Sequence, residues 1–600
     1  MHRFIRRVRE KHGSERGFYM IWFALTMVML MGFAGLALEF SRWDSLGNRI
    51  QKAADAAALA GAVFMPENIG NLAFTTAKTT ASKNGFTHGS DGVVITTAPG
   101  SLANQLKVTI SVPTKNPFGA IVGYSDSTIV RSAVGEYQLS QNLGSPENSF
   151  GNDPETCPGT EPCFPNFWGN IFGPSSPKGN GDAIQSVGPN NNSNLCPTST
   201  DNCASNVNKD YSAAGHFYGI DVPAGATGAL NVRIFDPAFV HVGDNCGVRA
   251  DGATDDNDAK NSLTVASALI EADIPGYPAG DPPSVRYAPG TTNKYCSGDQ
   301  HYNNLSNNLN PWTTWTLRAP DSSTWDPTDN PIVCQAEFPG LYPERANDLP
   351  NGPVDANHLA DLLKLPTDYA GTNPGRPFAS FFRQWVEICS VASPSQGTYF
   401  LQVQTATRIN GTSTPVAGGA NRYAVKVGLG TNFTSSNNLR LYGNARMGIY
   451  ANAKGADTRF YLTRVPSGHA GHRLVLQFFD VGDASQAGDI SVLPPTDSNV
   501  AGGLFSSCQY TAPPGASNGP PWGTLVNTAS GCKITNVSSS NFNGQWITLQ
   551  VEIPDTYSCN DGDPLGCWTQ LRFTYPASTN VNDTTTWAAF LLGDPVRLVE

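Results

Sequence analysis

The sequence predicts a single N-terminal transmembrane helix with an α-helical stalk, followed by a mainly β body of two tandem β-sandwich domains of the jelly-roll or Ig-like type. Residues 18–38 hold no charged side chain, and QKAADAAALAGA at 51–62 continues a helical pattern beyond them. From about residue 211 onward, short runs of alternating polar and apolar residues recur between turns rich in Pro, Gly and Asn. Such strands and turns are typical of β-sandwiches.

The uncharged run is long enough to cross a bilayer. As a helix that rises ~1.5 Å per residue, it spans about 31 Å, the thickness of a hydrocarbon core. A secretory signal has a shorter apolar core, of only ~7 to 15 residues. Residues 1–17 hold six basic and two acidic side chains, which predicts a cytoplasmic basic segment. The sequence therefore predicts a permanent single-pass anchor, with residues 39–600 outside the cytoplasm.

The predicted stalk, residues 39–90, has small residues on one helical face. Ile50, Ala54, Ala57, Gly61 and Phe64 recur at intervals of four and three residues. Such a face lets a second helix approach closely. The expected partner is the next segment, where alanine recurs at 73, 77 and 81 before an Asn-Gly stop at 84–85. The pattern predicts a helical hairpin.

The remaining chain divides by composition. Residues 91–137 predict a small β region, and residues 138–210, rich in Asn, Pro, Gly and Ser, predict a linker with disulfides. Two β-sandwiches are predicted at 211–430 and 440–600. A weak repeat, GALNVRIFD at 228–236 and HRLVLQFFD at 472–480, opens each sandwich. A duplication of one unit is the hypothesis that follows.

Charge and cysteine usage limit the partners and the compartment. The chain has a net charge of -11, and residues 1–17 carry +4, so the remainder carries -15. A body this acidic repels phosphates, so nucleic-acid binding is not expected. All twelve cysteines lie beyond residue 150, which favours disulfides in an oxidising compartment. The closest neighbours suggest local bridges, although the sequence leaves the connectivity open: Cys157/Cys163, Cys196/Cys203, Cys508/Cys532 and Cys559/Cys567.

The N-terminal segment resembles a known family. A basic stretch, Arg16-Gly17, an apolar helix that ends in GLALE at 35–39, and QKAADAAALAGA are similar to the N-terminal segment of TadE/TadG-like Flp pilus-assembly proteins. The likeness covers about residues 14–85. It implies a bitopic protein of the cytoplasmic (inner) membrane that works with the pilus apparatus, or a paralogue that kept only the anchor.

Two departures refine this resemblance. Pilin-like members are cut after a glycine and carry a glutamate five residues later, whereas the fifth residue after Gly17 is Trp22. The anchored, TadG-like type is therefore expected rather than a polymerising subunit. Many TadG-like proteins also carry a von Willebrand A domain, but no Asp-x-Ser-x-Ser run is present here, so that domain is not expected.

The sequence predicts no catalytic residue. It lacks the H-E-x-x-H, P-loop and G-x-G-x-x-G motifs. Carboxylates gather after the repeated strands, and loop oxygens of this kind suit Ca²⁺. Asp236, Asp244, Asp480 and Asp483 are the candidate calcium ligands, with turn-forming aspartates as the simpler interpretation. No other cofactor is expected.

Three functions are compared. The leading hypothesis is a non-enzymatic, membrane-anchored protein for pilus assembly, adhesion or envelope interaction, whose partners are the cytoplasmic membrane and other pilus-assembly or envelope proteins. The second is a tethered carbohydrate- or calcium-binding module, for which Trp312, Trp315 and Trp325 could contact glycans if they are exposed rather than core. The third is a hydrolase with an unrecognised pair of carboxylates.

Overall fold

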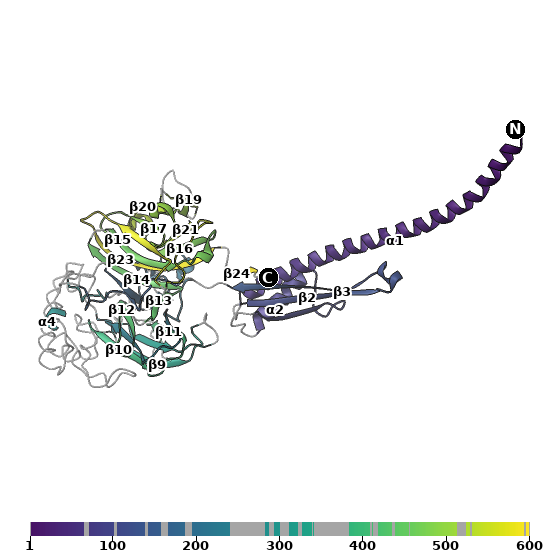
Figure 1. The fold of residues 1–600 in the computed structure, drawn as a ribbon. Helices are drawn as coiled ribbons and strands as arrows, with labels where there is room; N and C mark the ends of the chain where they lie inside the picture. The colour runs from purple at the N-terminus through teal and green to yellow at the C-terminus, as the bar shows by residue number, and fades with distance from the viewer. Residues whose placement is uncertain are drawn as a thin grey trace. The chain divides into compact units, whose positions relative to one another are not determined.

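The computed structural model (Figure 1) shows one long N-terminal helix followed by mostly β structure in several sheets. This confirms the fold class predicted from the sequence. The description covers the following residues: 2–64, 71–100, 105–137, 142–157, 166–186, 195–240, 283–286, 293–300, 311–321, 327–338, 340, 383–407, 411, 418–434, 438–454, 457–512, 524–528, 531–563, 565–592 and 596–598.

The chain forms two compact units, and the second is inserted into the first. One unit contains Met1–Gln138 together with Gly593–Glu600, and the other is Leu139–Leu592. We call them the stalk unit and the body. The sequence gives no sign of this arrangement, since residues 593–600 fall inside the range predicted for the second sandwich.

The stalk unit is two helices and one antiparallel sheet. Its helices are α1 (His2–Ala62) and α2 (Leu72–Lys83). Its sheet has the order β1-β2-β3-β24, with bounds β1 (Val94–Pro99), β2 (Gln105–Lys115), β3 (Asp126–Tyr137) and β24 (Val596–Leu598). β24 pairs with β3 from Val596↔Tyr137 to Leu598↔Gly135. The last strand of the chain therefore completes the N-terminal sheet.

The core of the stalk unit confirms the predicted helical hairpin. Alanines of α1 and α2 share one buried cluster with Leu106, Val108 and Ile110 of β2. α2 ends where the sequence predicts, at the cap Asn84, and Gly85 follows with a φ of 92°. A positive φ is the backbone conformation that glycine adopts without steric cost.

The body is built from one long sheet and two smaller ones, and the strands paired within its described residues run antiparallel. The long sheet runs β10-β7-β12-β5-β14-β23-β16-β21-β18-β19, with β4 beside β12. Its bounds are β4 (Ser149–Phe150), β5 (Phe167–Phe172), β7 (Leu230–Phe235), β10 (Trp385–Val391), β12 (Ala420–Leu429), β14 (Arg446–Lys454), β16 (Arg473–Phe479), β18 (Cys508–Thr511), β19 (Leu525–Asn527), β21 (Trp546–Glu552) and β23 (Asn580–Leu592).

Each half of the long sheet is covered by one smaller sheet. The first has the order β13-β6-β11-β8-β9 and the second β15-β22-β17-β20. Their bounds are β6 (His216–Val222), β8 (Thr313–Arg318), β9 (Ile332–Phe338), β11 (Gly397–Gln404), β13 (Arg440–Asn444), β15 (Asp457–Arg464), β17 (Gly488–Leu493), β20 (Lys533–Val537) and β22 (Trp568–Thr574). Two helices of four residues, α4 (Pro283–Arg286) and α6 (Ser539–Phe542), lie between strands in sequence.

Aromatic contacts show how these sheets face each other. In the first half, Trp315 of β8 packs edge-on against Tyr423 of β12, with ring centroids 4.7 Å apart. In the second half, Phe460 of β15 contacts Trp587 of β23 at 5.9 Å. These contacts describe two sandwiches that share one continuous sheet. β5, in the range predicted as a linker, pairs with β12 on one side and β14 on the other.

The body contains disulfides, as the sequence predicts. Three of the suggested local bridges are present, Cys196–Cys203, Cys508–Cys532 and Cys559–Cys567. A fourth bridge, Cys334–Cys389, joins β9 to β10 and was not predicted, because 55 residues separate its cysteines. Cys157 is also disulfide-bonded; its suggested partner Cys163 lies outside the described residues. No cysteine in the described part of the chain is free.

Candidate functional site

The first half of α1 exposes a long apolar surface. Leu30 and Phe33 are 68% and 66% exposed, and the exposed apolar side chains continue from Tyr19 to Phe40. A surface of this size is far larger than soluble monomers leave in water. Within the described residues, α1 is the one helix that is long and apolar enough to cross a membrane.

The second half of α1 has a buried face made of small residues. Ala54, Ala57 and Ala58 are completely buried against α2 and the sheet. A Cβ added to Gly61 would lie 2.7 Å from the carbonyl oxygen of Ala73 in α2. A Cβ added to Gly135 of β3 would lie 2.5 Å from the carbonyl oxygen of Ala58. The helix therefore approaches both neighbours too closely for larger side chains.

Glu39 lies between the exposed apolar half of α1 and its buried small-residue half. Its side chain is buried, with 3% of the residue exposed, although it directly follows the uncharged run. One carboxylate oxygen accepts the backbone N–H groups of Phe118 and Gly119, at 3.0 and 2.7 Å. Bonds from two N–H groups to one carboxylate are charge-assisted and strong. Glu39 thus ties the helix to the loop between β2 and β3.

Residues 19–63 match the model of one known family, described as putative Flp pilus-assembly TadE/G-like. These residues are therefore similar to that family, which confirms the resemblance seen in the sequence. The match coincides with the exposed apolar half of α1 and its buried small-residue face. It covers less than a tenth of the 600 residues, so it identifies the anchor and the first part of the stalk rather than the body. No curated protein matches the chain.

The structure places the predicted carboxylates Asp236 and Asp480 at equivalent positions. Each follows a strand, β7 or β16, and adopts a positive φ, 59° and 60°. Asp236 accepts the backbone N–H of Arg383, and Asp480 accepts that of Gly544. Both donors precede a Gln-Trp pair that opens β10 or β21. The weak sequence repeat therefore corresponds to a repeated local structure.

The register of the strands supports this equivalence. Trp385 pairs with Phe235, and Trp546 pairs with Phe479. Both indole groups donate to a carboxylate, Trp385 to Asp153 at 2.9 Å and Trp546 to Asp210 at 2.8 Å. Each of these carboxylates also pairs with a lysine. The tryptophans occupy equivalent positions in the two halves of the long sheet, whereas the lysines do not, since Lys426 belongs to β12 and Lys178 to a short 3-10 helix at 178–180.

Both carboxylate oxygens of Asp236 accept hydrogen bonds from the surrounding protein. One carboxylate oxygen accepts the N–H of Arg383 at 3.1 Å, and the other accepts the hydroxyl of Ser297. Burial raises the pKa of Asp236. The second buried carboxylate that interacts with it belongs to Asp299, which the sequence analysis did not select. Asp244 lies outside the described residues.

Asp480 has a different environment from Asp236. Its Oδ1 accepts the N–H of Gly544, but its buried Oδ2 has no hydrogen-bond partner within the protein. Burial and the charges of Asp483 and Asp583 raise the pKa of Asp480 well above its usual range. The structure thus brings Asp480, Asp483 and Asp583 close enough for their charges to interact. We call Asp480, Asp483 and Asp583 the acidic cluster.

Asp583 was missed because it lies in a strand a hundred residues further along. Its Oδ2 accepts the N–H of Gly482 at 2.8 Å, and Oδ1 accepts the hydroxyl of Thr585 at 2.9 Å. Burial raises the pKa of Asp583 as well. Only the pairing of β16 with β23 brings it beside the loop that follows Asp480, and no local sequence pattern signals that pairing.

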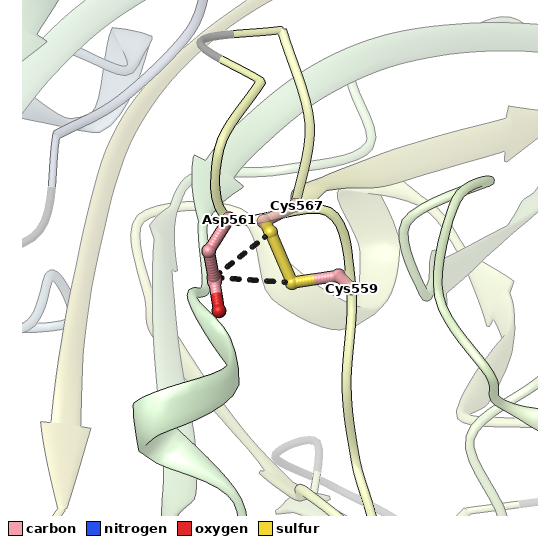
Figure 2. A group of neighbouring side chains, drawn as sticks. All are labelled: Cys559, Asp561 and Cys567. Atoms are coloured by element: carbon pink, nitrogen blue, oxygen red, sulfur yellow. Dashed lines mark hydrogen bonds between the residues drawn. A yellow bond between two sulfur atoms is a disulfide. The ribbon is translucent and has the colours of Figure 1, made fainter.

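Metal-binding geometry is found elsewhere in the described residues, at Cys559, Asp561 and Cys567 (Figure 2), whose ligand atoms lie within 4.8 Å of one another. Both sulfur atoms belong to the Cys559–Cys567 disulfide. A disulfide provides neither the thiolate that binds metals nor a hydrogen to donate. This group is therefore a covalent staple beside a carboxylate. Calcium binding by Asp236, Asp244, Asp480 and Asp483 stays a prediction.

A cavity opens between the two sheets of the second sandwich, next to the acidic cluster. The centre of a water-sized molecule can move within about 30 Å³ of it. Buried Asp583 lines it, and so do Tyr575 and Trp587, whose Oη and Nε1 atoms have no hydrogen-bond partner within the protein. Aromatic walls with a few polar atoms are typical of small-molecule sites. The other lining residues are Ile449, Ala451, Thr458, Phe460, Phe573, Val581 and Thr585.

The tryptophans considered for glycan contact lie elsewhere. Trp315 is completely buried, and its indole donates to the carbonyl of Pro237 at 3.1 Å, so it belongs to the core. Trp312 is partly buried. Trp325 lies outside the described residues.

Proposed function

We propose that this chain is a single-pass membrane protein that presents its body, without catalysis, to other pilus-assembly or envelope components. The TadE/G-like match and the exposed apolar half of α1 support the anchor. The basic residues before the span support a cytoplasmic N-terminus, because Lys and Arg are enriched on the cytoplasmic side of membrane helices. The disulfides support an extracytoplasmic body, since such bridges persist in oxidising compartments.

The observation that carries this proposal is the insertion of the body into the stalk unit. The body leaves the stalk sheet after β3 and returns to it at β24, the neighbour of β3. Both ends of the body are therefore attached to one sheet, which α1 covers. This connection suits a protein whose anchor must hold a large module against mechanical or assembly forces, because the body is connected to the stalk sheet at both of its ends.

Deletion of the gene in its own host tests the function. Loss of Flp-type pili or of adhesion, restored by the full chain, is the expected result. A variant that lacks 139–592 but keeps the stalk unit should insert in the membrane without restoring either property. Restoration by that variant would show that the body is dispensable, and unchanged piliation and adhesion in the deletion strain would contradict the proposal.

The second candidate function is ligand binding by the body, and the cavity beside the acidic cluster favours it. Stacking faces and hydrogen-bonding atoms occur together there, as sugar rings require. Glycan-array binding by the full chain in detergent, with calcium or with chelator, tests carbohydrate and calcium together. Asp583→Asn is the informative variant and Asp563→Asn the control. Binding that Asp583→Asn leaves intact would remove the cavity from consideration.

A further inference from the structure

The loop between β2 and β3 presents an apolar surface. Residues 116–125, NPFGAIVGYS, contain no charged side chain. Ile121 and Tyr124 are 82% and 72% exposed, and Phe118 is 42% exposed. Neighbouring apolar side chains with such exposure mark places where a protein meets a membrane or a partner. We call residues 116–125 the hairpin tip.

Three contacts within the stalk unit fix the hairpin tip beside the end of the apolar run of α1. The ring of Phe118 lies against Gly35, where an added Cβ would be 2.5 Å from Cδ1 of the ring. Glu39 accepts the N–H groups of Phe118 and Gly119, as described above. Further along the helix, Trp43 Nε1 donates to Asn116 Oδ1 at 3.0 Å.

The boundary between apolar and charged residues falls at the same level on both elements. On α1, the uncharged run ends at Leu38, and exposed charged side chains begin with Arg42. On the hairpin, Lys115 and Asp126 form an exposed ion pair at the base of the tip. At ~1.5 Å per residue, Gly35 lies about 5 Å inside the end of the uncharged run. A bilayer that surrounds this run therefore reaches the hairpin tip.

We propose that the hairpin tip is a second membrane contact, inserted with Ile121 and Tyr124 into the outer interfacial layer of the lipid bilayer. Tyrosine favours this layer because its ring is apolar and its hydroxyl is polar. The inference rests on the proposed anchor, since the span sets the level of the bilayer. A contact beside the helix would stop the stalk unit from tilting freely about the end of the span.

Lipid is the occupant that the geometry favours over a protein partner. The hairpin tip adjoins the one surface of the stalk unit that already requires lipid, the exposed apolar half of α1. The contacts with Gly35 and Glu39 make these two surfaces continuous. A protein that covered the tip would have to lie partly within the interfacial layer.

Spin labels on the full chain, reconstituted in vesicles of phosphatidylethanolamine and phosphatidylglycerol, test the proposal. All described native cysteines are bonded, so an introduced cysteine provides the reactive thiol. Ile121→Cys reports the tip and Val28→Cys the span. Val130→Cys, on β3 and 48% exposed in the native residue, is the matched control. Accessibility to oxygen, which concentrates in lipid, is compared with accessibility to a water-soluble nickel chelate.

The expected result is that oxygen accessibility exceeds nickel accessibility at 121 and 28, with the reverse order at 130. Lipid exposure at 28 together with water exposure at 121 would overturn the membrane contact and leave the anchor intact. Shielding of 121 from both reagents would also overturn it, in favour of a protein occupant. Water exposure at 28 would overturn the anchor, and the membrane contact with it.

A second pair of variants tests the positioning of the tip. Gly35→Leu places a side chain where the Phe118 ring lies, whereas an added Cβ at Gly32 has nothing within 4 Å. Gly35→Leu should reverse the order of the two accessibilities at 121 in the Ile121→Cys background and leave the order at 28 unchanged in the Val28→Cys background. Gly32→Leu should leave both unchanged. An unchanged order at 121 in the Gly35→Leu variant would contradict the role of this contact.

Discussion

At the scale of single residues, close packing explains why α1 carries the small-residue pattern seen in its sequence. Ala54, Ala57 and Ala58 are completely buried where α1 meets α2 and the sheet. Gly61 leaves room for the carbonyl of Ala73, and Glu39 caps N–H groups of the hairpin tip. Because helix and sheet backbones approach this closely, few other residue types are compatible with the packing.

A matched pair of substitutions in α1 tests the close packing. Gly61→Ala should destabilise the stalk unit by about 1–3 kcal/mol, because overpacking displaces the neighbouring backbone. Gly32→Ala, in the same helix, should leave it unchanged, since its added Cβ has nothing within 4 Å. Hydrogen exchange of the α2 amides in detergent measures the difference. Equal exchange in the two variants would show that the close contact at Gly61 does not determine the stability of the stalk unit.

The acidic cluster predicts a pH dependence of stability. Burial raises the pKa values of Asp480 and Asp583 above those of an unfolded chain. The folded state therefore holds protons that the unfolded state releases, and stability falls as pH rises from about 4, the usual pKa of an aspartate, through the raised pKa of about 6 for Asp583. Asp480→Asn, which stays neutral, should make this fall smaller.

Thermal unfolding of the full chain across this pH range measures the effect, with Asp563→Asn as the control. A control variant with the same reduction would show that the effect is not specific to the acidic cluster. Calcium provides a separate comparison, because a bound cation would replace the proton. A rise in Tm with calcium at pH 7 that Asp480→Asn abolishes would support the calcium prediction, and no rise would contradict it.

At the scale of elements, the long sheet is what makes the body one unit. β5 connects the halves by pairing with both β12 and β14. Two sandwiches were predictable because alternation along single strands is a local signal. The shared sheet was not, because pairing between strands hundreds of residues apart leaves no mark in either strand alone. Asp583 in the acidic cluster and Cys389 in its bridge to Cys334 were missed for the same reason.

Disulfides of different span offer a prediction at this scale. By the loop-entropy relation, removing Cys334–Cys389 should cost about 4 kcal/mol and removing Cys559–Cys567 about 2.5 kcal/mol. The separations are 55 and 8 residues. Paired Cys→Ser variants compared by denaturant unfolding provide the measurement. A larger loss for the shorter bridge would mean that chain entropy does not set the difference.

β24 gives a second prediction for the elements. Truncation after Leu592 should expose the outer edge of β3, because β24 pairs there from Gly135 to Tyr137. Faster hydrogen exchange of these three residues is expected, while α2 exchange changes less. Unchanged exchange of β3 after the truncation would show that the C-terminal strand contributes nothing to the stalk sheet.

The whole molecule combines a long apolar helix similar to TadE/G-like segments with a large, mainly β body. The run at 18–38 and QKAADAAALAGA were sufficient to predict the anchor and its helical hairpin, because both signals are local and periodic. The insertion of the body between β3 and β24 depends on a three-residue strand at the end of the chain. Such a strand is too short to be predicted by its pattern.

The topology of the anchored chain is the central claim, and thiol labelling in intact spheroplasts tests it most directly. Val130→Cys places a thiol on β3, and Ser14→Cys places one in the basic segment before the span. With a membrane-impermeant maleimide, the account predicts labelling at 130 in intact spheroplasts and at 14 only after permeabilisation. Labelling at 14 before permeabilisation, or at 130 only after it, would contradict a cytoplasmic N-terminus and an extracytoplasmic body.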